Sequence, residues 1–262
     1  MHYSKFQSSG RGRGECLAFE VNRIAGPADG LSNSPYLNHR RSVPPVSTVA
    51  ARVPLWKRVL DVTCILLAVP ILVPVALAII AVIKIGSRGP VLFKQERVGL
   101  RGQSFTIFKF RTMTNGADAR IHEAHCEQLI SSDAPMVKLD AKGDSRLIPG
   151  GRLLRAAGLD ELAQLLNVLR GEMSLVGPRP CLPAEAAQYL PWHRERFMAV
   201  PGLTGLWQVS GKNKTTFSEM MDLDIAYARN PSLGLDLKIM LKTFSAVVQQ
   251  VREMPIARHS LN

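Results

Sequence analysis

The longest uninterrupted hydrophobic stretch covers residues 62–83, VTCILLAVPILVPVALAIIAVI, and contains no charged residue. As a straight helix it would be about 33 Å long, enough to cross a hydrocarbon core of roughly 30 Å. Pro70 and Pro74 lie near its middle, where proline bends or breaks a helix. Lys and Arg flank both ends, and the positive-inside rule places such ends in the cytoplasm. The pattern favours a proline-broken re-entrant membrane helix over residues 53–88, with an ordinary span and a buried core helix as alternatives.

The rest of the chain alternates between strand-like and helix-like patterns. Residues 89–113 contain two β-rich runs around a glycine-bearing turn, which predicts a hairpin. A helix is expected to begin at Asp160 and to end by Gly171, with apolar residues at three- and four-residue spacings that mark its buried face. Those residues are Leu162, Leu165, Leu166 and Leu169. Further helices are expected near 115–130, before Gly158, and near 184–197, 216–229 and 235–250; the last is either a core helix or an interfacial one.

These elements predict an α+β, monotopic membrane protein. A small, mainly helical cytoplasmic domain carrying the β-hairpin is expected at 89–254, followed by a short tail at 255–262. Residues 1–52 are rich in Gly, Ser, Pro and Arg and lack sustained periodicity. Such a composition does not bury enough apolar surface to offset chain ordering, so we expect this basic N-terminal region to be disordered.

The net charge of the chain indicates which class of molecule it binds. The net charge is +12, and residues 1–58 hold nine Lys/Arg against three acids, which is +6 of that total. An anionic partner is therefore expected: nucleic acid, a membrane surface or a phosphorylated substrate. Nucleic acid is disfavoured because no aromatic stacking platform accompanies the arginines. The four cysteines have no CxxC spacing, and His122, His125 and Cys126 fall short of the four ligands of a closed zinc site.

The adjacent acids Asp160 and Glu161 are the main candidates for chemistry. Aspartate at a helix start is also a common cap, and that alternative stays open. Arg155 precedes the pair, and Arg179 lies between two prolines that restrict its backbone. Guanidinium groups suit bidentate phosphate contacts. Lys109 and Arg111 add further positive charge. This set of residues suits magnesium-assisted phosphoryl transfer in which an aspartate attacks phosphorus.

The motifs resemble those of the bacterial sugar transferases, the small monotopic phosphoglycosyl transferases that use polyprenyl phosphates. The resemblance spans about residues 55–250, with the motifs in order. They are KRVLDV (57–62), GPVLFKQERVG (89–99), FKFRTM (108–113), LDELAQLLNVLRGEMSLVGPRP (159–180), PGLTGLWQVSGKN (201–213) and LDLKIM (235–240).

This resemblance implies transfer of sugar 1-phosphate from a UDP-sugar, of galactose or glucose type, to undecaprenyl phosphate. UMP leaves, and the product starts an exopolysaccharide or O-antigen repeat unit. It implies that Asp160 is the nucleophile, that Asp160 and Glu161 hold Mg²⁺, and that Arg155 and Arg179 face phosphates. Gln208 is expected to contact the nucleotide or sugar. The implied location is the inner membrane, with the catalytic domain facing the cytoplasm.

Several positions depart from the family pattern. Val73 precedes Pro74 where serine is frequent, Gly158 replaces a serine, and Val200 stands where an arginine usually precedes PGLTG. Lys212, Pro231 and Gly234 also differ. These differences leave one alternative, a catalytically weak membrane scaffold that recruits other polysaccharide assembly proteins.

Overall fold

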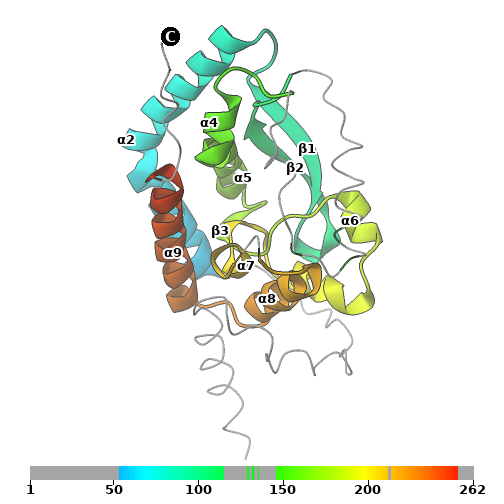
Figure 1. Cartoon of the computed structure of the whole chain (residues 1–262). Helices are drawn as coiled ribbons and strands as arrows, with labels where there is room; N and C mark the ends of the chain where they lie inside the picture. The colour runs from blue at the N-terminus through cyan, green and yellow to red at the C-terminus, as the bar shows by residue number, and fades with distance from the viewer. Residues whose placement is uncertain are drawn as a thin grey trace, which may run out of the picture.

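The computed structural model describes residues 53–114, 146–211 and 214–252, with three single positions (129, 132 and 135) between the first two ranges. The predictions for 1–52 and 255–262, most of the helix expected at 115–130, and the His122–Cys126 cluster lie outside the described residues. Figure 1 shows a long helix along one side of the molecule and a hairpin among shorter helices.

The apolar run forms helix α2, Leu55–Gly86. Within the described ranges it is the one helix long and apolar enough to cross a membrane. Pro70 and Pro74 lie inside a helix that is continuous from end to end, so the expected break at these prolines is not confirmed. The helix does change direction along its length (Figure 1).

The two ends of α2 pack against the rest of the protein. Ile65 belongs to a buried cluster with Ile107, whereas Ile79 and Ile83 belong to a second cluster with Phe110. Ile107 and Phe110 are about 10 Å apart along a strand, but Ile65 and Ile79 would be about 21 Å apart on a straight helix. A bent helix brings both ends close to one strand. Between the ends, exposed apolar side chains include Leu66, Leu67, Val69, Ile71, Val73 and Leu77.

The predicted hairpin is confirmed. Strand β1, Leu92–Val98, pairs antiparallel with β2, Ser104–Phe110, and the short 3-10 helix η3, Leu100–Gly102, makes the turn. Phe93 pairs with Lys109 at one end of the hairpin and Val98 pairs with Ser104 at the other. The hairpin therefore provides two separate ends on which side chains can be placed.

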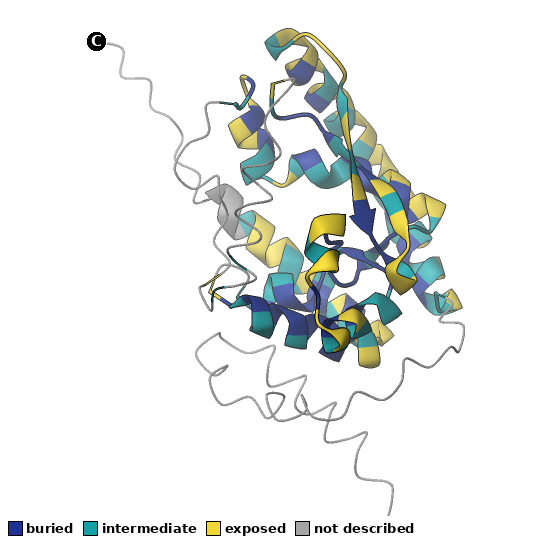
Figure 2. Cartoon of the chain, turned by 90° about the vertical axis from the view of Figure 1, so that its right-hand side faces the viewer, coloured by how far each residue is buried: buried dark blue, intermediate teal, exposed yellow. Residues whose placement is uncertain are grey.

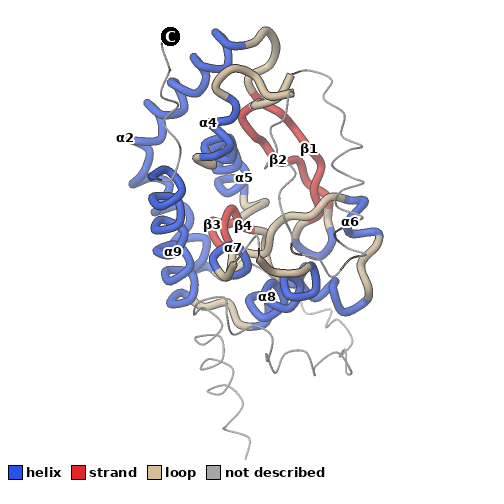
Figure 3. Tube along the Cα trace, viewed as in Figure 1, coloured by secondary structure: helices blue, strands red, loops and turns tan. Residues whose placement is uncertain are grey.

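The remaining elements surround a second, parallel strand pair that the hydrophobic pattern did not predict. Strand β3, Ser174–Val176, pairs with β4, Gly202–Thr204 (Figure 3). Gly202 is required there because a Cβ on it would lie 2.1 Å from the backbone nitrogen of Gly177. Buried residues gather on the strands and the neighbouring helices (Figure 2). The helices are α4 (Gly151–Ala156), η5 (Leu159–Gln164), α5 (Leu165–Arg170), α6 (Pro183–Ala187), η6 (Pro191–Met198), α7 (Leu206–Val209), α8 (Phe217–Arg229) and α9 (Leu233–Arg252).

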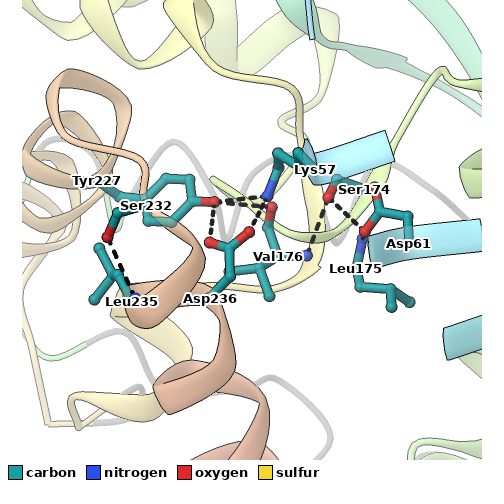
Figure 4. Close-up of polar contacts among 9 residues, drawn as sticks. All are labelled: Lys57, Asp61, Ser174, Leu175, Val176, Tyr227, Ser232, Leu235 and Asp236. Atoms are coloured by element: carbon teal, nitrogen blue, oxygen red, sulfur yellow. Dashed lines mark hydrogen bonds and ion pairs between the residues drawn. The ribbon is translucent and has the colours of Figure 1, made fainter. Parts of the chain in front are cut away.

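A buried polar network joins the start of α2 to α8 and α9. The Nζ of Lys57 donates to Oδ2 of Asp236 at 2.5 Å and to the hydroxyl of Tyr227 at 2.8 Å (Figure 4). That hydroxyl lies 2.6 Å from Oδ1 of Asp236. One turn along α2, Asp61 accepts from the Ser174 hydroxyl of β3. The amino-terminal part of α2 is thus fixed by paired charges rather than by apolar contact alone.

Removing one member of this network should cost more than removing a surface ion pair. In an Asp236→Ala variant the buried Lys57 ammonium loses its counter-charge, and we expect about 3–5 kcal/mol of destabilisation. The combined Lys57→Met and Asp236→Leu change should recover most of that loss, because no charge stays buried. Thermal unfolding in detergent measures both variants.

The matched control is Arg229→Ala, which breaks the more exposed Arg229–Glu195 pair of 2.6 Å. It should shift stability by less than about 1 kcal/mol. Equal losses for Asp236→Ala and the double variant would contradict the assignment.

Candidate active site

The acidic pair lies on the short 3-10 helix η5, directly after a glycine turn. Gly158 has φ 68°, a left-handed conformation that glycine adopts without strain. Gly158, not Asp160, is the residue that caps η5, and no side-chain capping hydrogen bond is present. Asp160 is therefore not the N-cap residue, but Asp160 and Glu161 do lie in the first turn of η5, where acids complement the helix dipole.

Asp160 is buried, with 8% of its surface exposed. Burial raises the pKa of this carboxyl, because loss of water disfavours the charged form. Lys109 and Arg155 lower the pKa through their positive charge, whereas the neighbouring Glu161 raises it. The expected grouping of Asp160 with Glu161, Lys109 and Arg155 is therefore found in the structure.

Glu161 points to the hairpin. Its Oε1 accepts a hydrogen bond from Nζ of Lys109 at 3.0 Å, and both side chains are partly exposed. A pair open to water contributes little to stability. The Lys109–Glu161 pair holds a carboxylate and an ammonium group beside Asp160. An anionic substrate that binds there could take the place of Glu161 on the Lys109 ammonium.

The helix that follows η5 does not bury the leucines that its pattern indicated. Leu166 and Leu169 are 46% and 41% exposed, whereas Ala163, Asn167 and Val168 are buried. The predicted buried face is wrong for these two leucines. The predicted end at Gly171 is confirmed, since Gly171 adopts φ 82° at the carboxyl end of α5.

Asn167 is the residue that fixes α5 to strand β2. Its Nδ2 donates to the backbone oxygen of Thr106 and to Glu172, both at 2.7 Å, and its Oδ1 accepts from the backbone N–H of Phe108 at 3.1 Å. Lys109 is the next residue on the strand. Asn167 therefore sets the position of Lys109 relative to the helix pair that carries Asp160.

The acidic pair also rests on the apolar helix α2. Ala163 belongs to the buried cluster of Ile79 and Ile83 on α2, and the partly buried Leu159 and Leu162, which flank Asp160 and Glu161, pack against that cluster. At its other end, α5 accepts hydrogen bonds from Arg58 through the backbone oxygens of Val168 and Leu169. The segment 159–170 is thus held at both ends by α2.

Arg111, a predicted substrate ligand, is buried in the turn after α2. Its guanidinium donates to the backbone oxygens of Ser87 and Pro90 and to the Ser87 hydroxyl, at 2.6–3.2 Å. These contacts close the connection between α2 and β1. Arg111 has a structural role on this geometry, and its role in substrate binding stays a prediction.

Arg179 lies near the opposite end of the hairpin from Lys109. It lines a shallow pocket with Val98 and Gly99, and its neighbour Cys181 bridges to Val98. Val98 is five residues, or about 17 Å, from the partner of Lys109 along β1. The backbone of Arg179 therefore lies toward the end of the hairpin opposite to Lys109.

A buried ion pair holds the backbone of Arg179. The guanidinium of Arg196 donates to the backbone oxygen of Arg179 at 2.6 Å and to Oδ2 of Asp224 at 2.5 Å. Its other nitrogen donates to the hydroxyl of Tyr189 at 2.7 Å. Arg196 and Asp224 were not found by sequence reasoning, and neither was Asn167, because single polar residues among apolar ones carry no distinct local signal.

Gln208 lies beside the same segment. Its Nε2 donates to the backbone oxygen of Leu203 at 3.2 Å, and its buried Oε1 has no hydrogen-bond partner among the described atoms. A Cβ on Gly205 would lie 2.6 Å from this Oε1 and 2.2 Å from the backbone oxygen of Gly177. Gln208 is thus placed beside Gly205, which itself packs against Gly177, two residues before Arg179.

Comparison with known proteins identifies the family. A model described as "Bacterial sugar transferase" matches residues 52–250, and the chain belongs to this family. The chain is 44% identical over 204 residues to the UDP-glucose:undecaprenyl-phosphate glucose-1-phosphate transferase of Caulobacter vibrioides, covering 75% of this chain and 71% of that protein. It is 37% identical to the exopolysaccharide production protein ExoY of Sinorhizobium fredii, covering 73% and 84%. Identity to the undecaprenyl-phosphate galactose phosphotransferase of Salmonella typhimurium is 35%, covering 74% and 40%. The predicted sugar transferase class is confirmed.

Replacing Asn167 tests its positioning role. An Asn167→Ala variant leaves the Phe108 N–H and the Thr106 oxygen without partners, and we expect a loss of about 2–4 kcal/mol in unfolding free energy. Chemical denaturation in detergent measures it. Gln103→Ala, which removes an exposed amide from the hairpin turn, is the control and should change stability by less than about 0.5 kcal/mol. A loss no larger than that of the control would show that Asn167 does not clamp the strand.

Proposed function

We propose that this protein transfers sugar 1-phosphate from a UDP-sugar, of glucose or galactose type, to undecaprenyl phosphate. UMP is released, and the lipid-linked product starts an exopolysaccharide or O-antigen repeat unit. The name of the Caulobacter relative supports UDP-glucose and undecaprenyl phosphate as substrates, and that of the Salmonella relative supports undecaprenyl phosphate and galactose. The observation that carries the proposal is the position of Asp160, buried beside Lys109 and Arg155 on a segment packed against an apolar helix.

The chemistry proceeds in two displacements. The ionised Asp160 carboxylate attacks the phosphorus that carries the sugar, a P–O bond to Asp160 forms, and the bond to UMP breaks. A phosphate oxygen of undecaprenyl phosphate then attacks the same phosphorus and releases Asp160. The carboxylate is restored, and the lipid diphosphate sugar leaves. A buried carboxylate suits this role because it has little water to lose before it attacks.

The positively charged side chains around Asp160 neutralise the negative charge of the substrate diphosphate. Lys109 and Arg155 are next to Asp160, where they keep the carboxylate ionised and stabilise charge on the phosphate that is attacked. Arg179 lies toward the far end of the hairpin. We assign it to a more distant part of the same elongated substrate, on the nucleotide side of the reacting phosphorus.

Magnesium fits the oxygen ligands of this site. The described residues contain no group of three or more His, Cys, Asp or Glu side chains that would form a complete cage. Mg²⁺ is commonly held by one or two carboxylates together with substrate phosphates and water. Asp160 and Glu161 would hold it, and when bound it would neutralise charge on the diphosphate.

The anchor proposed for this reaction is a re-entrant α2 in the inner membrane, with both ends in the cytoplasm. Three observations support it: the ends of α2 pack on one domain, the middle exposes apolar side chains, and the helix bends. Lys57 and Arg58 at the start and Lys84 and Arg88 at the end carry positive charge. The acidic pair would then lie close to the headgroup of a lipid phosphate.

Asp160→Asn tests the nucleophile. We expect transfer to fall by roughly three orders of magnitude or more, because an amide does not replace a carboxylate nucleophile. Stability at neutral pH should stay equal or rise, because the variant no longer buries a charge. The assay incubates detergent-solubilised protein with magnesium, undecaprenyl phosphate and a panel of UDP-sugars, and measures UMP. The control is Glu96→Gln, which removes the charge of an exposed carboxylate on strand β1 of the hairpin.

Retention of UMP release in Asp160→Asn would overturn the nucleophile assignment. If the native chain released no UMP from any UDP-sugar and instead co-purified with envelope proteins, the scaffold alternative would replace the enzyme.

The raised pKa of Asp160 predicts the pH dependence of transfer. Because the reaction needs the carboxylate, activity should fall as pH drops through this pKa, above the value of about 3.9 for an ordinary aspartate. Lys109→Ala removes a charge that lowers the pKa, so the acid limb of kcat/KM should move to higher pH. Glu161→Gln should move it to lower pH. Limbs that coincide in all three proteins would show that Asp160 does not control the profile.

A further inference from the structure

Every backbone carbonyl group of the segment 178–181 accepts a hydrogen bond from another part of the chain. At the two ends of the segment the donors are backbone amides. The oxygen of Pro178 accepts from the N–H of Gly202 at 2.9 Å. The oxygen of Cys181 accepts from the N–H of Val98, also at 2.9 Å. The segment is therefore attached to β4 at one end and to β1 at the other.

Buried guanidinium groups hold the two middle carbonyl groups. Arg196 of η6 donates to the oxygen of Arg179 at 2.6 Å. Arg97 of β1 donates to the oxygen of Pro180 at 3.2 Å. Arg196 and Arg97 are 2% and 4% exposed. Hydrogen bonds from an ionised donor are roughly twice as strong as neutral ones, so the backbone around Arg179 has little freedom to move.

Both terminal nitrogens of Arg196 are engaged inside the protein. One donates to the hydroxyl of Tyr189 at 2.7 Å, and the other donates to Oδ2 of Asp224 at 2.5 Å as well as to Arg179. Burial raises the pKa of Asp224 to about 6, and the positive charges of Arg196 and Arg179 oppose that shift. A substrate that met Arg196 directly would have to break this buried pair, so Arg196 is not placed to bind one.

Arg179 differs from the residues around it. Within 176–182 it is the one residue that is not buried, and it lines the pocket beside Val98. No hydrogen bond to its guanidinium group is found among the residues that the structure describes. Pro178 and Pro180 restrict the backbone on both sides of it. A fixed backbone with a side chain open to a pocket suits ligand binding, because few torsions remain to be ordered when the ligand arrives.

We propose that Arg97, Arg196 and Asp224 are positioning residues that hold Arg179 in place for the phosphate on the nucleotide side of the UDP-sugar. Arg179 meets the substrate, and the other three residues act through its backbone. This assignment rests on the proposed function and deepens it, because it names the residues that set affinity for the nucleotide. Loss of the positioning should weaken binding and leave the chemical step at Asp160 unchanged, which raises KM without lowering kcat.

Three full-length variants test the positioning. Arg196→Lys keeps a positive charge opposite Asp224, but a single ammonium replaces the planar fork that reaches several acceptors at once. Asp224→Asn removes the counter-charge of Arg196. Arg97→Gln removes the donor to the Pro180 oxygen and leaves the Arg196–Asp224 pair intact.

The proteins are assayed in detergent with magnesium and undecaprenyl phosphate. UMP release is followed against the concentration of the UDP-sugar that gives the highest rate, and binding of UMP alone is measured by calorimetry. For each variant we expect KM and the Kd of UMP to rise roughly tenfold, with kcat within about twofold of the native value. Thermal unfolding identifies the variants that are folded.

Tyr189→Phe is the matched control. It removes another hydrogen bond of the same guanidinium at a buried site and leaves the bond to the Arg179 oxygen in place. Its KM and its Kd for UMP should stay within about twofold of the native values. A double-mutant cycle with Arg179→Ala is the second control. If Arg196 acts through Arg179, Arg196→Lys should change the Kd by less than about twofold once the Arg179 side chain is absent.

Three results would overturn the proposal. The first is a native KM and Kd in the folded variants. The second is an equal loss of UMP affinity with and without the Arg179 side chain, which would indicate general damage to the fold. The third is a loss of kcat at unchanged KM, which would place these residues in the chemical step. If the native protein releases UMP and the variants bind UMP as tightly as it does, this inference alone fails. If the native protein releases no UMP from any UDP-sugar, the proposed function fails, and UMP binding still decides the positioning roles.

Discussion

The structure depends on the packing of both ends of one apolar helix against a single domain. The apolar window of α2 is only 11% buried, so the contacts at its two ends set its position relative to the domain. Ile65 at one end and Ile79 and Ile83 at the other are buried in clusters that include residues of the same strand. Lys57 adds a buried ion pair with Asp236, which costs desolvation unless both charges are present. The relative position of anchor and domain is therefore specified by apolar and ionic contacts together.

The position of Asp160 and Glu161 follows from this packing. Segment 159–170 is packed on α2 through Ala163 and bonded to it through Arg58, and Asn167 joins it to strand β2. A carboxylate placed in such a junction loses water, which is unfavourable for folding and favourable for a nucleophile. Buried catalytic groups commonly cost stability, and the burial of Asp160 is consistent with the catalytic role proposed for it.

The hairpin separates the candidate site into two parts. Lys109 stands at the end near the acidic pair, whereas Arg179 is held near Val98 by the buried Arg196–Asp224 pair. The proposed substrate is elongated, with a sugar phosphate at one end and a nucleotide at the other. Such a molecule could contact both the Lys109 region and the Arg179 region of the hairpin. The family resemblance grouped these residues by expected role, and the register of β1 and β2 places their backbones toward opposite ends of the hairpin.

The sequence by itself determined the apolar helix, the hairpin, and helices α8 and α9, because hydrophobic period and turn residues are local properties. It also singled out Asp160 and Glu161 through residue type and resemblance. It misassigned Leu166 and Leu169, because a hydrophobic period does not distinguish a residue inside the domain from one on an exposed apolar surface. Only the tertiary structure decided which polar residues matter for position. Asn167, Arg196 and Asp224 act through partners far away in the chain, and the short parallel pair of β3 and β4 exists because distant backbones meet there. Contacts between residues remote in sequence leave no local pattern, so the fold had to be known before they could be assigned.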